Sequence, residues 1–426
     1  MSKTMKTLSL GLAVSLLFAC QAKPLQLTDL NIAHPSSYAS FADIQAVPRQ
    51  YLLKRTGEAM IGSPSNDGKR LISGSDYLAQ QYGVQVLKVI EPIGFELISV
   101  HPDRRPEEVI PALRKDKHVL YVEPNYIRRL QVRPSQNQSA SGSPLTQMAA
   151  TASSKTPGVS GIIAILDTGI DSSEPTLQDK ILPGYNLFSS LEPNDDSGHG
   201  TWMAGLIASG GGTSSGLEAD AQLLPVKVLD RDGYGSDAGL IEGICWAVTH
   251  GAKVITLGMA GKQGSQALEE AVQYANQQGV TLVAAAGNDG QSNSYPAAIA
   301  GVLSVGALDG NTIASFSPQA SWLSVVAPGS NLTSTTPQGE VSLSSMGLSA
   351  GRGKISSTTG SAAYVAALAL MVKKQHPTWT PGQIRQRIQE SADDLGRPGR
   401  DPQYGFGRVN FRKALAPATT TQGRAR

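Results

Sequence analysis

From Gly158 to about Pro417 the chain alternates short apolar runs with longer stretches whose apolar residues recur at helical spacing. The best strand candidates are rich in β-branched residues and span 162–166, 223–228, 253–257, 281–285 and 302–305. Near-continuous apolar runs of this length are typical of strands that are covered on both faces. Because they alternate with helical patterns, they indicate a parallel sheet between two layers of helices. We therefore predict a three-layer α/β domain over residues 158–417.

A smaller pattern precedes this domain, over residues 46–130. It predicts strands at 51–54, 84–89, 95–100 and 120–122, and helices at 75–82 and 106–115. The order β-α-β-β-α-β is that of a small ferredoxin-like α+β unit, which could be a free-standing domain. The polar segments 21–45 and 131–157 have no period, so we predict a tether and a linker there, and a short tail at 418–426.

The first 20 residues have the pattern of an export signal. Lys3 and Lys6 precede an apolar run over 8–19, which is too short to span a bilayer. The run ends at Cys20 in a sequence that resembles the bacterial lipobox, where the cysteine receives acyl chains. The alternative is an ordinary signal peptide that is cut after a small residue. We expect an exported protein, either a cell-envelope lipoprotein anchored through Cys20 or a secreted protein without membrane contact.

The composition argues against a disordered chain, a nucleic-acid-binding protein and a fold that is held by disulfides. Hydrophobic residues make up 40% of the chain and charged residues 16%, which is a globular composition. The net charge of +2 comes from 36 basic and 34 acidic residues, so no nucleic-acid partner is expected. The only cysteine besides Cys20 is Cys245, in an apolar helical run. We expect a buried structural thiol there and no disulfide.

Three polar segments at predicted strand or helix ends carry candidate chemistry. Asp167 follows the strand 162–166, at the sheet edge where parallel sheets build their sites. His199 lies between two glycines at the head of a small-residue helix, which has little packing rationale unless backbone must approach something closely. Asn288 follows another small-residue strand. A carboxylate, an imidazole and an amide donor are three of the four groups that acyl transfer requires.

These segments resemble the catalytic segments of the subtilisin family. They read Asp167-Thr168-Gly169, Ser197-Gly198-His199-Gly200-Thr201 and Ala286-Gly287-Asn288, and the unit at 46–130 resembles the family's inhibitor propeptide. The resemblance implies a serine-type endopeptidase in which Asp167 orients His199, the general base, and Asn288 binds the oxyanion. It further implies a polypeptide substrate and the chain's own propeptide as an intramolecular inhibitor. No cofactor or metal is expected, because segment 209–215 lacks the Asn-bearing insertion of the family's calcium loop.

The resemblance also places the substrate-binding edges. Gly235 falls on one edge strand, and Gly258, Met259 and Ala260 fall on the other edge and the wall of the primary pocket. The usual family residues at this second edge are Ser-Leu-Gly-Gly, so this sequence departs from the pattern that sets the preference of the pocket.

The residue at the nucleophile position departs further from the family pattern. The segment beginning at Tyr364 matches the family's nucleophile helix without a gap, and counting back five residues gives Thr359 where the family has serine. Thr359 can act as a secondary-alcohol nucleophile, although its β-methyl group restricts the side chain. Ser361 is an alternative, but it lies roughly 200° further around the helix. The third alternative is an inactive protein of the same fold that binds peptides in the same cleft.

Overall fold

The computed structural model describes residues 45–57, 60–61, 72–131, 133–134, 161–210, 216–290, 294–339, 341–342 and 348–417. The predicted export signal with Cys20, the tail at 418–426, and most of the tether and the linker lie outside the described residues. None of the helices among the described residues combines the length and the hydropathy that a bilayer-spanning helix requires.

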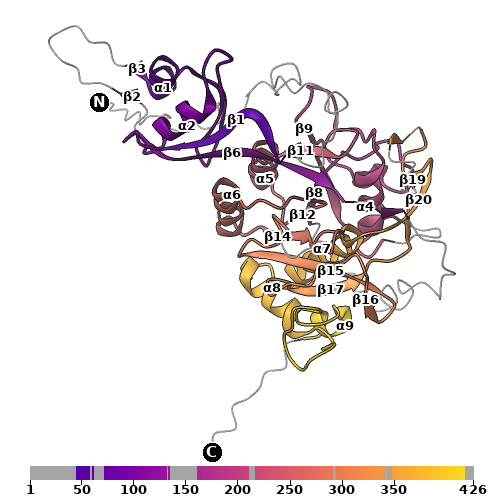
Figure 1. The fold of residues 1–426 in the computed structure, drawn as a ribbon. Helices are drawn as coiled ribbons and strands as arrows, with labels where there is room; N and C mark the ends of the chain where they lie inside the picture. Colours follow the sequence, from indigo (N-terminus) through magenta and orange to yellow (C-terminus); the bar gives the residue numbers. More distant parts are fainter. Residues whose placement is uncertain are drawn as a thin grey trace, which may run out of the picture.

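The larger unit is built on a parallel sheet with β8 near its middle (Figure 1). Its strands run in the order β16-β15-β14-β12-β8-β10-β9, with β17 beside β15. Their bounds are β8 Ile162–Asp167, β9 Tyr185–Asn186, β10 Gln222–Lys227, β12 Val254–Leu257, β14 Thr281–Ala285, β15 Val302–Asp309, β16 Thr312–Ile313 and β17 Val325–Pro328. Strand β8 pairs in parallel with β10 on one side and β12 on the other, and only the short β16 joins antiparallel. Asp167 therefore ends a central strand at the carboxyl edge of the sheet.

Helices cover both faces of this sheet, which confirms the predicted three-layer α/β fold. One face carries α4 (His199–Ala208), α7 (Thr358–Gln375), α8 (Pro381–Glu390) and α9 (Phe411–Leu415), and the other carries α5 (Asp237–Thr249) and α6 (Gln266–Gln277). In β8, Ile163 and Ile165 belong to the core with α4 and α7, whereas Ala164 and Leu166 belong to the core with α5 and α6. Because side chains alternate along a strand, Asp167 faces the layer of α4 and α7.

The smaller unit is an antiparallel sheet in the order β6-β1-β5-β4, with two helices on one face. Its elements are β1 Ala46–Arg55, β2 Met60–Ile61, β3 Ile72–Ser73, α1 Gly74–Tyr82, β4 Val84–Ile90, β5 Phe95–Val100, α2 Pro106–Leu113 and β6 Val119–Leu130. This confirms the predicted β-α-β-β-α-β order. The opposite face of the sheet, with Leu52, Phe95 and Leu97, is part of the core that contains α5 and α6. The two units are thus packed together through apolar side chains.

Polar contacts at two helix N-termini add to this packing. The Glu123 carboxylate accepts hydrogen bonds from Ser265 Oγ at 2.9 Å and from the backbone N–H groups of Gln266 at 3.0 Å and Ala267 at 2.8 Å. A carboxylate in this place satisfies unpaired N–H groups and complements the dipole of α6. Asn125 does the same for α5, since its Oδ1 accepts from the Ala238 N–H at 3.0 Å.

Strand β6 is longer than the sequence predicted. We expected a strand over 120–122, but β6 runs from Val119 to Leu130 and continues across the larger unit (Figure 1). The extension exists because β6 gains partners there: it pairs antiparallel with β11 (Tyr234–Ser236) and with β13 (Met259–Ala260). The expected linker at 131–157 also begins with ordered backbone, since β7 (Arg133–Pro134) pairs with β20.

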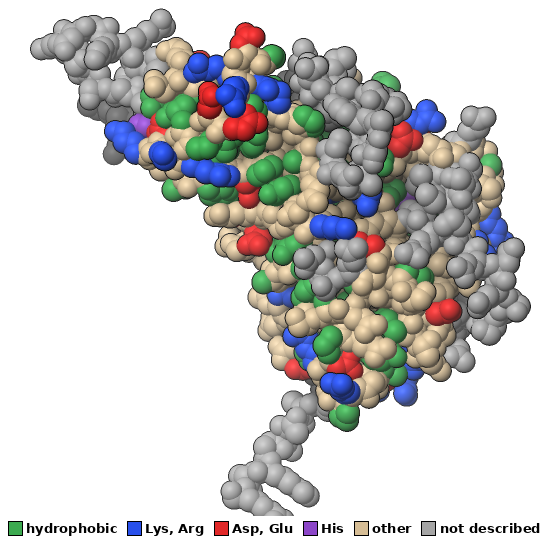
Figure 2. All heavy atoms as spheres, in the orientation of Figure 1, with side chains coloured by type: hydrophobic (Ala, Val, Ile, Leu, Met, Phe, Trp, Pro, Cys, Tyr) green, Lys and Arg blue, Asp and Glu red, His purple; other side chains and the backbone are tan. Residues whose placement is uncertain are grey.

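The larger unit also contains several short elements. They are the 3₁₀ turn Gln178–Lys180, β18 Leu332–Ser334, β19 Leu348–Ser349 and β20 Arg352–Ser356. Figure 2 shows basic and acidic side chains interspersed over the described part of this face, without an extended area of one sign, as the even charge balance suggests.

Cys245 is buried in α5, and burial raises the pKa of its thiol to about 12, so it is a structural residue as expected.

Candidate active site

Asp167 and His199 form a buried pair. Asp167 Oδ1 lies 2.8 Å from His199 Nδ1 and also accepts the Thr168 N–H at 2.8 Å, and both side chains are fully buried. This contact leaves Nε2 as the ring nitrogen that can accept a proton from a nucleophile. Among the described residues Nε2 has no hydrogen-bond partner.

The glycines beside His199 are required by backbone geometry. Gly198 precedes α4 with φ 101°, a left-handed conformation that favours glycine. A β-carbon at Gly200 would lie 2.0 Å from the Gly169 carbonyl oxygen, so this turn of α4 packs directly on the loop after β8. The close backbone approach that the sequence indicated therefore brings the helix of His199 to the loop that follows Asp167.

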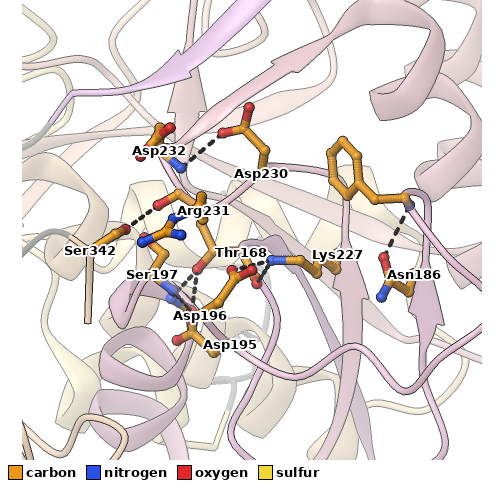
Figure 3. A network of polar contacts seen from close by, with 12 residues as sticks. Thr168, Asn186, Asp195, Asp196, Ser197, Lys227, Asp230, Arg231, Asp232 and Ser342 are labelled. Carbon is orange, nitrogen blue, oxygen red and sulfur yellow. Dashed lines mark hydrogen bonds and ion pairs between the residues drawn. The ribbon is translucent and has the colours of Figure 1, made fainter. Parts of the chain in front are cut away.

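A carboxylate and a lysine hold the loop before His199 (Figure 3). Asp195 accepts hydrogen bonds from Thr168 Oγ1 at 2.8 Å and from the N–H groups of Ser197, Gly198 and Thr201 at 3.0, 2.8 and 2.8 Å. Lys227, at the end of β10, donates to the Thr168 carbonyl at 2.6 Å and to Asp196 at 2.7 Å. These contacts join the loop after β8 to the N-terminus of α4, and so fix the two residues of the pair relative to each other.

Two hydrogen-bond donors converge beside this pair, at the N-terminus of α7. Asn288 Nδ2 and the Thr359 N–H both donate to the hydroxyl oxygen of Ser357, at 2.9 and 3.0 Å. Thr358 fixes the Asn288 side chain, because its N–H donates to Asn288 Oδ1 at 2.8 Å. An amide and a backbone N–H that point at one oxygen are the geometry that stabilises an oxyanion.

Thr359 lies next to the aspartate–histidine pair, with Gly258 between them. A β-carbon at Gly258 would lie 2.2 Å from Asp167 Oδ2 and 3.1 Å from the methyl carbon of Thr359. The missing side chain at 258 thus leaves space for the additional methyl group at 359. In the structure Thr359 Oγ1 accepts a hydrogen bond from Ser357 Oγ at 2.8 Å and makes none with His199.

The structure gives Ser361 another role. Its hydroxyl lies 3.1 Å from the Ala327 carbonyl oxygen and 3.0 Å from that of Pro328, both in β17. This is the side of α7 that packs on the sheet, so Ser361 is a buried packing residue and we do not propose it as a nucleophile.

Strand β6 runs through the substrate-binding edges that the sequence indicated. Gly235 pairs with Arg128, and Met259 and Ala260 pair with Leu130 and Arg129, so β6 lies between β11 and β13. Beyond the strand, the Gln131 carbonyl oxygen accepts a hydrogen bond from Asn288 Nδ2. The Gln131 side chain accepts from the Asn288 backbone N–H at 2.6 Å. Gly258 lies at the aspartate–histidine pair rather than along β6.

Sequence reasoning missed four residues of this site: Ser357, Gln131, Arg128 and Asp237. Ser357 stands where the family motif has its leading glycine, so the departure itself was a signal. Arg128 forms a fully buried ion pair with Asp237, and Gln131 reaches Asn288 across the two units. No local pattern marks these contacts, because they depend on how the two units pack.

A buried aspartate–histidine pair at the carboxyl edge of a parallel sheet, beside two converging donors at a helix N-terminus, is the architecture of acyl-transfer hydrolases. The model of the subtilase family matches residues 158–407, and the model of the fervidolysin N-terminal prodomain matches residues 72–125. The chain belongs to the subtilase family.

Similar proteins support this assignment over most of the chain. Subtilisin E of Bacillus subtilis is 32% identical over 374 residues, which cover 83% of this chain and 92% of that protein. A thermostable alkaline protease of Halalkalibacterium halodurans is 40% identical over 259 residues, which cover 59% of this chain and 66% of that protein. Among solved structures, fervidolysin of Fervidobacterium pennivorans shares the fold with a TM-score of 0.73 at 24% identity. The match covers 89% of this chain and 63% of that one.

Proposed function

We propose that the chain is an exported subtilisin-like serine-type endopeptidase that hydrolyses peptide bonds through an acyl-enzyme, with Thr359 as its nucleophile. The observation that carries the proposal is the hydrogen bond from Asn288 Nδ2 to the Gln131 carbonyl oxygen. In this contact the peptide carbonyl of the residue that directly follows the propeptide unit 46–130 lies at the donor that would stabilise an oxyanion. The export part rests on the apolar N-terminal pattern and on relatives such as the minor extracellular protease Epr of Bacillus subtilis.

In the proposed reaction His199 Nε2 takes the hydroxyl proton of Thr359 while Oγ1 attacks the carbonyl carbon. The carbonyl oxygen becomes negative and accepts hydrogen bonds from Asn288 Nδ2 and the Thr359 N–H. The carbon–nitrogen bond then breaks, and His199 returns the proton to the leaving amine. A water molecule, activated by His199 in the same way, then attacks the ester between Thr359 and the substrate. This step releases the new carboxylate of the substrate and regenerates the Thr359 hydroxyl.

This reaction requires one rearrangement of the resting site. Thr359 Oγ1 must turn from Ser357 Oγ toward His199 Nε2, and Ser357 Oγ must leave the point at which the two donors converge. Catalytic hydrogen bonds often form only in the substrate complex, so the resting contacts are compatible with the mechanism. The space at Gly258 accommodates the threonine methyl group that would otherwise crowd the pair.

Self-processing is the first test of this proposal. The purified full-length chain is expected to cut itself after Gln131, because that carbonyl is held by Asn288, and to release casein fragments afterwards. Intact-mass spectrometry and N-terminal sequencing would then find a new N-terminus at Val132. A chain that remains whole and leaves casein intact would contradict the proposed activity, whereas processing at another bond would contradict only the predicted register.

The space at Gly258 gives a second prediction. Gly258→Ala is expected to lower kcat by roughly 10²-fold, because the new methyl group would displace the Asp167 carboxylate or Thr359 from their positions. Casein hydrolysis and melting temperature would be measured together. Gly382→Ala is the matched control, since a β-carbon there meets only ordinary contact at 3.7 Å, and it should leave turnover unchanged.

A second function has one observation in its favour. Thr359 Oγ1 is engaged by Ser357, and His199 Nε2 has no partner among the described residues, which also suits an inactive subtilisin-fold protein that binds peptides in the cleft. Such a protein would retain β6 in the cleft and show no self-processing in any nucleophile variant. The lipid anchor at Cys20 is a separate proposal, which mass analysis of the membrane-associated protein would test.

A further inference from the structure

A buried ion pair lies in the cleft, upstream of the Gln131 carbonyl. Arg128 is the third residue before Gln131, and its side chain is 1% exposed. Its guanidinium binds the fully buried Asp237 carboxylate with two hydrogen bonds, from Nε to Oδ1 at 2.5 Å and from Nη2 to Oδ2 at 2.7 Å. Nη1 also donates to the Gln263 carbonyl at 2.8 Å. Each of the three guanidinium nitrogens therefore donates a hydrogen bond.

The surroundings of Arg128 are shaped for a guanidinium. A β-carbon at Gly261 would lie 2.5 Å from Arg128 Nη1 and 3.2 Å from Cδ, so only glycine leaves room for the arginine side chain. Asp237 is the first residue of α5, and Gly261 directly follows β13. Both groups belong to the larger unit, so this pocket is built by the catalytic unit and filled by the propeptide.

Electrostatics make the pocket selective. Burial raises the pKa of Asp237, and the Arg128 cation opposes this shift by stabilising the carboxylate. A buried carboxylate without a cation is strongly unfavourable, so a ligand that supplies a guanidinium gains more here than at the surface. Lysine would supply the charge without the two parallel hydrogen bonds. The next residue, Arg129, is exposed, so the binding is particular to one position of the strand.

We propose that the cleft selects peptides with arginine at the fourth position before the cleaved bond, and that Asp237 determines this preference. The inference rests on the proposed endopeptidase function. A substrate that lies between β11 and β13 as β6 does, with its cleaved carbonyl where that of Gln131 lies, brings its fourth residue to Asp237. The simpler alternative is that the pair only fastens the propeptide. The experiment separates the two because it uses substrates that are not part of the chain.

The test uses the self-processed protein and quenched fluorescent peptides with the sequence of residues 126–134. Replacing the arginine that corresponds to Arg128 by leucine is expected to lower kcat/KM by roughly 30-fold or more. The same change at the place of Arg129 should alter it by about twofold at most. In the Asp237→Asn variant the difference in kcat/KM between the parent peptide and the peptide with leucine at the place of Arg128 should largely vanish. Equal cleavage of these two peptides by the wild type would overturn the inference and leave the proposed activity standing.

If the wild type cuts no peptide, the proposed activity and the preference in cleavage fail together, and a binding measurement then tests whether the pocket at Asp237 selects arginine in the bound strand. A recognition sequence for an added protease is inserted between residues 140 and 150 of the full chain, which is then cut there. Dissociation of the freed propeptide is measured for Arg128→Leu and, as the matched control, Arg129→Leu. Arg128→Leu is expected to weaken retention by roughly 30-fold or more. Equal retention of the two variants would overturn the inference without reference to catalysis.

Discussion

Thr359→Ala is expected to abolish both self-processing and casein hydrolysis, a loss of about 10⁴-fold or more. The proposed mechanism gives Thr359 Oγ1 the bond-forming step, and alanine has no group to replace it. Thr359→Ser is expected to retain at least the wild-type rate, because serine keeps the hydroxyl and lacks the methyl group that restricts its rotation. Processing on a gel and casein release would be measured for all three proteins.

The matched control for this prediction is Ser361→Ala. Ser361 binds the carbonyl groups of β17, so its loss should lower stability by about 1 kcal/mol and leave turnover in place. Turnover that survives in Thr359→Ala and disappears in Ser361→Ala would show that the nucleophile has been assigned to the wrong residue. Wild-type and Thr359→Ala proteins that are equally inert would favour the inactive peptide-binding protein.

The parts of the site that lie in one local segment could be predicted from the sequence. Asp167 ends an apolar strand, and His199 stands between two glycines that have no packing rationale, so both carry a local signal. The structure gives the physical reason: Gly200 packs on the Gly169 carbonyl, and Gly198 adopts a left-handed conformation. The α/β fold was predictable on similar grounds, because a covered parallel strand is apolar along its whole length.

The remainder depends on contacts between distant segments. No local sequence pattern indicates that β6 continues to Leu130. The extension pairs with β11 and β13, which lie more than a hundred residues away in the sequence. The same packing brings Arg128 to Asp237. The polar composition over 131–157 predicted a linker, although a strand that lies on the surface of another unit can also be polar. Composition could not distinguish these two environments.

Asp167 has the second largest expected effect, for an electrostatic reason. Its carboxylate is fully buried, contacts His199 Nδ1 at 2.8 Å, and accepts the Thr168 N–H on the same oxygen. Oδ2 has no hydrogen-bond partner among the described residues. When His199 takes the proton of Thr359, the positive ring is stabilised by the Asp167 carboxylate, whose charge is little screened because the pair is buried.

Asp167→Asn is therefore expected to lower kcat by about 10⁴-fold while the fold is retained. The amide keeps the size of the carboxylate and removes the charge, and its NH₂ group would lie at the Oδ2 position, where the described residues offer no acceptor. Turnover and melting temperature would be measured together. Asp171→Asn is the matched control in the same loop, because the Asp171 carboxylate accepts hydrogen bonds from the N–H and hydroxyl groups of Ser173, at 2.9 and 2.7 Å, and makes no contact with His199, and the variant should retain full activity. A kcat that falls equally in both variants would mean that Asp167 acts by holding the loop, since a charge beside the imidazolium is lost only in Asp167→Asn.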